Sequence, residues 1–140
     1  MTDLNRRTLL GTLAGVLAAG TTLEGAELPS VLFDAQKTPA EAHPFGTLRT
    51  YCSGPTPGLK NLVIGSLTLN PGAEPHPPHT HDDEEILIVT EGAGQITMSG
   101  KASDVASGAV MYVTPNYLHG IVNTGAKPLT FFFIKWRTGS

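Results

Sequence analysis

The chain has 140 residues, a formal net charge of -3 and only 15% charged residues, and this length is usual for a single domain. The body of the chain contains no basic cluster, which argues against binding to nucleic acid or to an anionic membrane surface. With 16 Gly and 11 Pro, a coiled coil or a helical bundle is a poor candidate, and many short strands joined by turns are favoured. Cys52 is the single cysteine, so no intramolecular disulfide is expected and stability must come from packing.

The first twenty residues have the pattern of an export signal. Arg6 and Arg7 precede an uncharged apolar run over residues 9–20, which is too short to span a bilayer. We predict that residues 1–20 form a secretory signal peptide, and its paired arginines resemble a twin-arginine signal, which is read on proteins that fold before export. The alternative is a basic N-terminal segment that is retained. The prediction places the mature protein in the periplasm or outside the cell, with no membrane attachment after the signal is removed.

The remainder divides into an arm and a β-rich domain. Residues 21–44 contain prolines and small residues and are predicted to form an N-terminal arm with one short strand at 30–33. Residues 45–140 are predicted to form the domain, because short apolar or β-branched runs recur there between Gly, Pro, Asn and Ser clusters. Such spacing is typical of an all-β sandwich or barrel. The seven predicted strands are 45–52, 59–69, 84–91, 94–99, 109–114, 119–123 and 128–136.

The last predicted strand carries large apolar groups on both faces. Phe131, Phe132, Phe133, Ile134 and Trp136 lie within six residues, whereas a strand with one wet face alternates apolar and polar residues. One face is therefore expected to line the interior. The other is expected to contact either a second sheet or a partner subunit, because an apolar patch of that size is rarely left in water.

Histidines and one carboxylate are spaced as metal ligands. His79 and His81 project from the same face of an extended chain, and Glu85 has the same parity if the extension persists to it. A fourth ligand must come from another strand, and His119 is the best-placed remaining histidine. Three imidazoles and one carboxylate suit Fe, Mn, Ni, Cu, Co or Zn, and they leave one or two positions for water or substrate.

Two segments resemble the conserved motifs of the cupin superfamily. PGAEPHPPHTHDDEEILIVTEG resembles the first cupin motif at Gly72, His79, His81, Glu85 and Gly92. GAVMYVTPNYLHGIVN resembles the second motif at Gly108, Asn116, His119 and Asn123. The departures are mild: six residues instead of the usual five separate Gly72 from His79, Thr114 stands where proline is usual, and Asn116 replaces a frequent glycine.

The resemblance implies a fold, a ligand set and an assembly. A small single-domain cupin is a jelly-roll β-barrel with little helix, often a homodimer, and it would hold one divalent metal through His79, His81, Glu85 and His119. A divalent ion beside one carboxylate retains about one positive charge, which favours a carboxylate, enolate or hydroxyl ligand.

Three functions remain open at this point. The first is a metal-dependent enzyme, dioxygenase-like, acting on a small oxygen-rich organic molecule. The others are a non-catalytic module that binds a sugar or carboxylate, and a structural cupin whose site is vestigial. An enzyme also needs an acid, a base or a substrate clamp, for which His76 and Tyr117 are the weak candidates. The default interpretation of His76 is a solvated loop residue, and that of Tyr117 is core packing.

Overall fold

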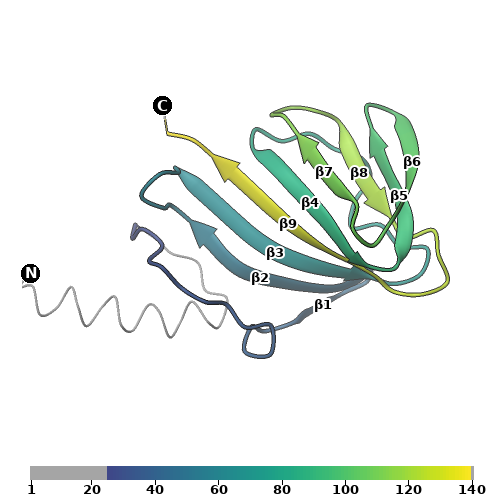
Figure 1. Ribbon diagram of the computed structural model, residues 1–140, viewed down its shortest axis with the longest axis horizontal. Helices are drawn as coiled ribbons and strands as arrows, with labels where there is room; N and C mark the ends of the chain where they lie inside the picture. The colour runs from purple at the N-terminus through teal and green to yellow at the C-terminus, as the bar shows by residue number, and fades with distance from the viewer. Residues whose placement is uncertain (1–24, 140) are drawn as a thin grey trace, which may run out of the picture.

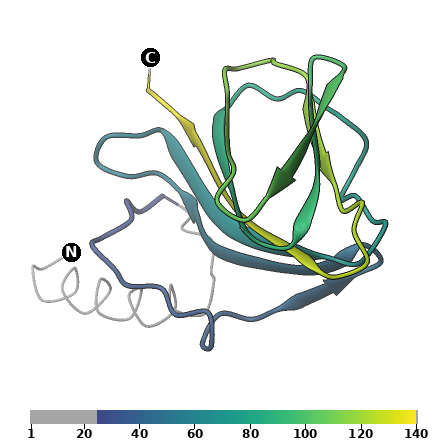
Figure 2. The same cartoon turned by 45° about the vertical axis from the view of Figure 1, so that its right-hand side comes forward.

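Two antiparallel sheets face each other and form a jelly-roll β-barrel (Figures 1 and 2). The computed structural model describes residues 25–139, so the predicted signal peptide lies outside the described residues. Within 25–139 the regular elements are strands, and no helix there is long and apolar enough to cross a membrane. The predicted all-β jelly-roll fold is confirmed.

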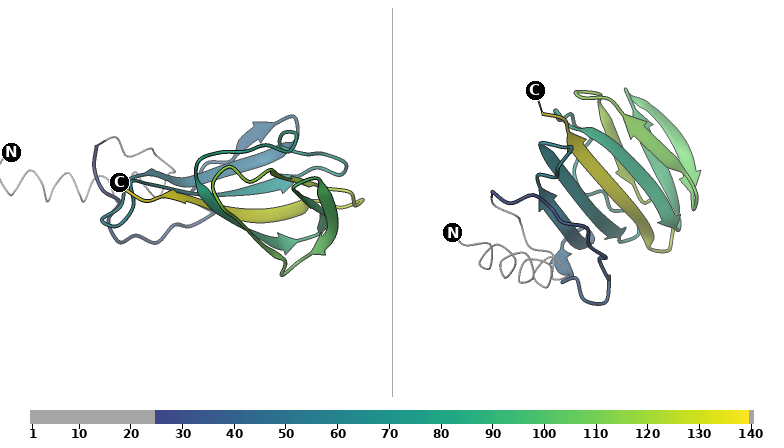
Figure 3. Two further views of the ribbon diagram at one scale, coloured as in Figure 1. Left: turned by 90° about the horizontal axis from the view of Figure 1, so that it is seen from above. Right: turned by 60° about the vertical axis from the view of Figure 1, so that its left-hand side comes forward.

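The larger sheet has six strands and the smaller one has three. In spatial order the larger sheet contains β1 (Glu41–His43), β2 (Gly46–Gly54), β3 (Asn61–Leu69), β9 (Leu129–Arg137), β4 (Glu84–Glu91) and β7 (Val110–Val113). The smaller sheet contains β6 (Lys101–Ala106), β5 (Ala93–Met98) and β8 (His119–Val122). Figure 3 shows the curvature of the larger sheet, whose concave side faces the smaller one.

The core lies between the two sheets and determines which residues point inward. On β4, Glu85, Leu87 and Val89 are buried, while the residues between them are only half-buried. Burial of the aliphatic members of this set fixes the register, since a slip by one residue would turn every side chain to the other face. Glu85 therefore reaches the interior because it shares the parity of two core residues.

All seven strands predicted from apolar runs are present, with ends shifted by at most two residues. The strand expected at 30–33 is wrong: this segment has no strand partner, and the ring of Phe33 lies 5.9 Å from that of Tyr51 instead. Two strands were not predicted. β1 is only three residues long, and β6 is a mostly exposed edge strand without the apolar run used as the criterion.

Asn123 ties together the loops at one end of the barrel. Its side chain is completely buried, donates hydrogen bonds to the carbonyls of Leu69 and Lys127, and accepts one from the Gly125 amide. Its backbone also pairs with Gly72 and Ala73. Asn123 thus positions the start of the segment that leads to His79, and it makes no side-chain contact with the histidines.

The side of the larger sheet that faces away from the smaller one is apolar. This outer apolar face is formed where β9 and its neighbours direct alternate residues away from the core, and it comprises Ile64, Ile86, Ile88, Val110, Phe132, Ile134 and Trp136. The arm covers only one border of it, where Phe33 packs on Tyr51 and Tyr51 stacks on Phe132. At the other border Val110 and Tyr112 are 65% and 48% exposed.

We expect a second copy of the chain to cover the outer apolar face and form a homodimer, because a flat apolar sheet can be self-complementary about a two-fold axis. Val110→Lys, at an exposed position outside the core, should shift the molar mass measured by light scattering from dimer toward monomer. Ala102→Lys, on the exposed strand β6, is the matched control and should leave the dimer intact. A wild-type protein that is monomeric at about 100 µM, a concentration at which interfaces of micromolar affinity are occupied, would contradict this expectation.

Candidate metal centre

A short backbone bridge brings the two histidine segments together. The His79 amide donates to the His119 carbonyl at 2.9 Å, and the His119 amide donates to the His79 carbonyl at 3.0 Å, as in an antiparallel pair. The Asn116 amide adds a hydrogen bond of 2.7 Å to the His81 carbonyl. Asn116 has φ of 62°, a left-handed conformation that Asn tolerates better than most residues. Asparagine at position 116, in place of the more frequent glycine, is therefore compatible with this loop.

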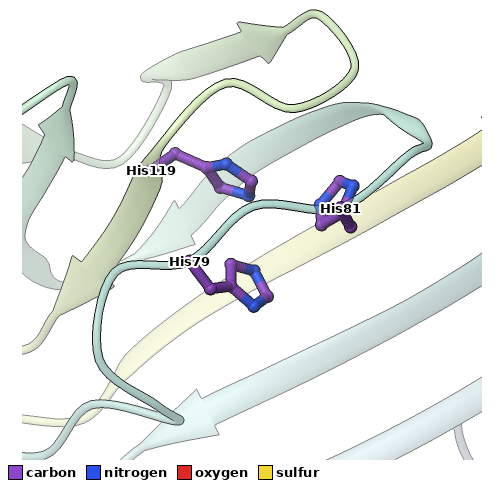
Figure 4. Close-up of side chains that lie close together, drawn as sticks. All are labelled: His79, His81 and His119. Atoms are coloured by element: carbon purple, nitrogen blue, oxygen red, sulfur yellow. The ribbon is translucent and has the colours of Figure 1, made fainter.

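The three predicted histidine ligands face one common point (Figure 4). One ring nitrogen from each of His79, His81 and His119 lies within 4.8 Å of the other two. The Nδ1 atoms of His81 and His119 lie 3.0 Å and 2.7 Å from the carbonyls of Asp83 and Tyr117. A carbonyl can only accept, so both Nδ1 atoms carry hydrogen, and a metal would bind at the Nε2 atoms, which point toward Glu85.

Glu85 completes the cluster despite a bend in the chain. Residues 82 and 83 leave the extended conformation, yet Glu85 Oε2 lies 2.8 Å from His81 Nε2 and 2.9 Å from His119 Nε2. Two ligands at right angles around an ion, each about 2.1 Å from it, would be about 3.0 Å apart. The observed separations are hydrogen-bond distances close to that value, so the spacing of these three donor atoms is compatible with a single transition-metal ion.

The neighbouring acidic residues have other partners. Asp83 accepts a hydrogen bond from Arg137 at 3.0 Å, and Glu84 accepts one from the Tyr112 hydroxyl at 2.6 Å. Among the carboxylates of this acidic run, that of Glu85 is the one hydrogen-bonded to the imidazoles. The Glu85 carboxylate reaches the imidazoles because Glu85 is one of the alternate residues of β4 that point into the barrel.

Burial and hydrogen bonding set the protonation of the carboxylate. Glu85 is only 7% exposed, and burial alone would raise its pKa. Hydrogen bonds from His119 and His81 outweigh this effect, so the pKa of Glu85 lies below its usual value. The carboxylate is consequently ionised at neutral pH, as a metal ligand must be.

The imidazoles differ in their proton affinity. Burial, followed by charge repulsion from His76 and the other two site histidines, lowers the pKa of His79 to about 4. For His119 the hydrogen bond to Glu85 has the largest effect and raises the pKa, although burial and the positive charge of Lys135 oppose it. His79 is therefore neutral at pH 7, while a metal would displace a proton from the His119–Glu85 contact.

A pocket opens beside the cluster, with a volume of about 100 Å³. His79, Glu85 and His119 are part of its wall, together with His76 and Lys135. Apolar side chains supply most of the remainder, namely Leu67, Leu87, Ile121, Phe131 and Phe133. The pocket is thus a small, mainly apolar chamber with the candidate ligands at one end.

The two weak catalytic candidates occupy different places. The ring of His76 stacks on that of His79 with centroids 3.8 Å apart, and His76 lines the pocket. Tyr117 contributes its carbonyl to His119, but its side chain is 38% exposed and is not part of the pocket wall. Sequence reasoning did not single out Lys135, although the period-two alternation of the last strand would have placed it with Phe131 and Phe133.

The family follows from the comparison with known proteins. The family model described as "Cupin domain" (Cupin_2) matches residues 65–135, half of the chain, including the four predicted ligands. The chain belongs to the cupin family. Among curated proteins, this cupin is 28% identical to dimethylsulfoniopropionate lyase DddW of Ruegeria pomeroyi over 85 residues, 61% of this chain and 55% of that protein. The chain therefore spans about half the length of the curated relative that it matches.

Solved structures agree on the fold. KdgF from Halomonas sp. superposes with a TM-score of 0.65 at 19% identity, covering 78% of this cupin and 96% of that chain. The polyketide cyclase RemF from Streptomyces resistomycificus gives a TM-score of 0.63 at 21% identity, covering 77% and 80% of the two chains. At these identities the similarity shows a shared fold and carries no information on activity.

We expect Glu85→Gln to weaken binding of a divalent metal by at least about tenfold, because the only carboxylate at the cluster is neutralised. Competition with a chelator of known affinity measures this change. Glu84→Gln, one residue earlier and on the opposite face of β4, is the control and should bind metal like the wild type. Equal metal affinity for Glu85→Gln and wild type would show that the three histidines suffice and that Glu85 is not a ligand.

Proposed function

We propose that this cupin is a mononuclear metal-dependent enzyme acting on a small oxygen-rich organic molecule. The observation that carries the proposal is the convergence of three imidazoles and one carboxylate beside a pocket that admits a small ligand, with His79, His119 and Glu85 in the pocket wall. His79, His81, Glu85 and His119 would hold one Fe, Mn, Ni, Cu, Co or Zn ion. Such an ion supplies Lewis acidity and, if redox-active, electron transfer.

The chain itself provides binding, orientation and proton transfer. The apolar walls formed by residues such as Leu87 and Phe131 exclude water from one side of the substrate. His76 is the better candidate for a base: its Nδ1 lies 2.9 Å from the Pro77 carbonyl, which only accepts, so Nδ1 carries the hydrogen and Nε2 has the lone pair. Tyr117 orients His119 through its carbonyl, and its side chain has no assigned part in the reaction.

Two reaction classes are compatible with this site. The ligand set favours dioxygenase-like oxidation, because a site with open positions can accept substrate and oxygen together. The relationship to a dimethylsulfoniopropionate lyase favours elimination. There a base would remove the proton beside the carboxylate, the carbon–sulfur bond would break, and acrylate and dimethyl sulfide would form. A non-catalytic module that binds a sugar or carboxylate is the alternative to both.

Metal content is the first measurement that we would make. Protein purified without added metal or chelator should contain about one equivalent of a divalent transition metal by mass spectrometry, as expected for one four-donor site. The double variant His79→Ala/His81→Ala should lose it, whereas His43→Ala, at the end of strand β1, should keep it. A folded wild-type protein that holds no metal, even after reconstitution, would leave only the binding or scaffold alternatives.

The metal-loaded protein then distinguishes the reaction classes. Elimination predicts dimethyl sulfide in the headspace on incubation with dimethylsulfoniopropionate, without oxygen consumption. Dioxygenase chemistry predicts oxygen uptake with an oxygen-rich substrate and no dimethyl sulfide. Neither signal over a panel of small carboxylates and sugars, in the presence of measurable binding, would favour the non-catalytic alternative.

We also propose that the protein is exported in the folded state to the periplasm or the cell exterior. The proposal rests on Arg6, Arg7 and the following apolar run. Replacing both arginines with lysine conserves charge and should abolish the periplasmic fraction when bacteria expressing the full chain are fractionated. An unchanged periplasmic level would indicate that the paired arginines are not read by a twin-arginine receptor.

A further inference from the structure

A lysine shares the pocket with the candidate ligands. Lys135 on β9 is directly opposite Glu85 on β4 in the sheet register, and both side chains belong to the pocket wall. Lys135 is thus the cationic side chain of the wall, and it approaches the cluster from the neighbouring strand.

The ammonium group is held by an aromatic ring and not by a carboxylate. Nζ of Lys135 lies 5.9 Å from the centroid of the Phe133 ring, within the range of a cation–π contact. Gly65 leaves the space for that ring, since a Cβ at this position would lie 2.3 Å from Phe133 Cζ. The ion pairs among residues 25–139 do not include Lys135. Its three N–H donors therefore retain capacity for a ligand.

The net charge of the metal-loaded pocket favours the binding of an anion. A divalent ion beside Glu85 leaves about one positive charge, and Lys135 adds another. The remaining wall is mainly apolar, so these charges are weakly screened and attract a negative group more strongly than in open water. A carboxylate between the ion and the ammonium would interact with both and reduce this positive charge from about two to about one.

The pocket volume limits the rest of the molecule. An apolar cavity of about 150 Å³ accepts benzene. The pocket of about 100 Å³ therefore suits a ligand portion of about four non-hydrogen atoms on that scale. Leu67, Leu87 and Phe131 would contact its hydrocarbon part.

We propose that Lys135 is a specificity-determining residue that anchors the carboxylate of a short aliphatic acid in the pocket beside the metal cluster. This inference deepens the proposed function and rests on it for the metal, but the ammonium anchor acts whether or not a metal is bound. The pocket therefore selects an anionic ligand over an uncharged one of the same shape.

The test compares butanoate with butanamide, which differ in charge and hardly in size. Dissociation constants are measured by NMR titration of amide shifts, on metal-free and on Zn²⁺-loaded full-length protein. Wild type should bind butanoate more tightly than butanamide in both forms. Lys135→Met, which keeps the length of the side chain, should weaken butanoate binding by about tenfold or more, the loss expected for one charge-assisted hydrogen bond. Butanamide binding should not change.

Two further variants show whether a loss of butanoate affinity comes from the loss of the positive charge or from a change in the fold. Lys135→Arg retains a positive charge and should retain most of the preference for butanoate. Lys101→Met removes a lysine from the exposed strand β6 and should behave like wild type. The dispersion of the same spectra reports whether each variant is folded.

Two results would overturn the anchor. One is a wild-type protein that does not prefer butanoate over butanamide. The other is a folded Lys135→Met variant with the wild-type affinity for butanoate. Failure of the proposed function looks different: if wild type binds no metal but Lys135→Met still loses butanoate affinity, the anchor stands and the metalloenzyme does not.

Discussion

The candidate site depends on the pair of backbone hydrogen bonds between His79 and His119. His79 lies in the segment that leads into β4 of the larger sheet, whereas His119 begins β8 of the smaller sheet. The bridge therefore joins the two layers at the point where their ligands meet. Because it uses main-chain atoms, it fixes the separation of the two Cα atoms whatever the side chains are. The imidazoles are then oriented by carbonyls within two residues, so the cluster needs few long-range side-chain contacts to be preorganised.

Most strands and the grouping of the histidines were predictable because they depend on local patterns. Apolar runs located seven strands, and period-two spacing grouped His79 with His81. β6 escaped prediction because an exposed edge strand gains little from apolar residues, so KASDVA carries no such pattern. The expected strand at 30–33 failed for the opposite reason: its apolar residues reflect packing of Phe33 on Tyr51 and not sheet pairing.

The site was less predictable where it depends on contacts across strands. The bend at residues 82 and 83 breaks the parity argument from His81 to Glu85, and only the three-dimensional fold returns the carboxylate to the imidazoles. Lys135 lies fifty residues from Glu85 in the sequence, and the alternation that groups it with Phe131 and Phe133 does not show which residue of β4 it faces. The register of β4 and β9 places Lys135 opposite Glu85. This register depends on the pairing of two segments that are distant in the sequence, so a local pattern does not predict it.

Alternate side chains of strand β9 belong to two different surfaces. Phe131, Phe133 and Lys135 line the pocket, and Phe132, Ile134 and Trp136 belong to the outer apolar face. Insertion or deletion of one residue in this strand would exchange the two sets, carrying the ammonium out to the sheet surface and an indole into a chamber too small for it. Length changes in β9 should therefore be far rarer among natural variants than substitutions.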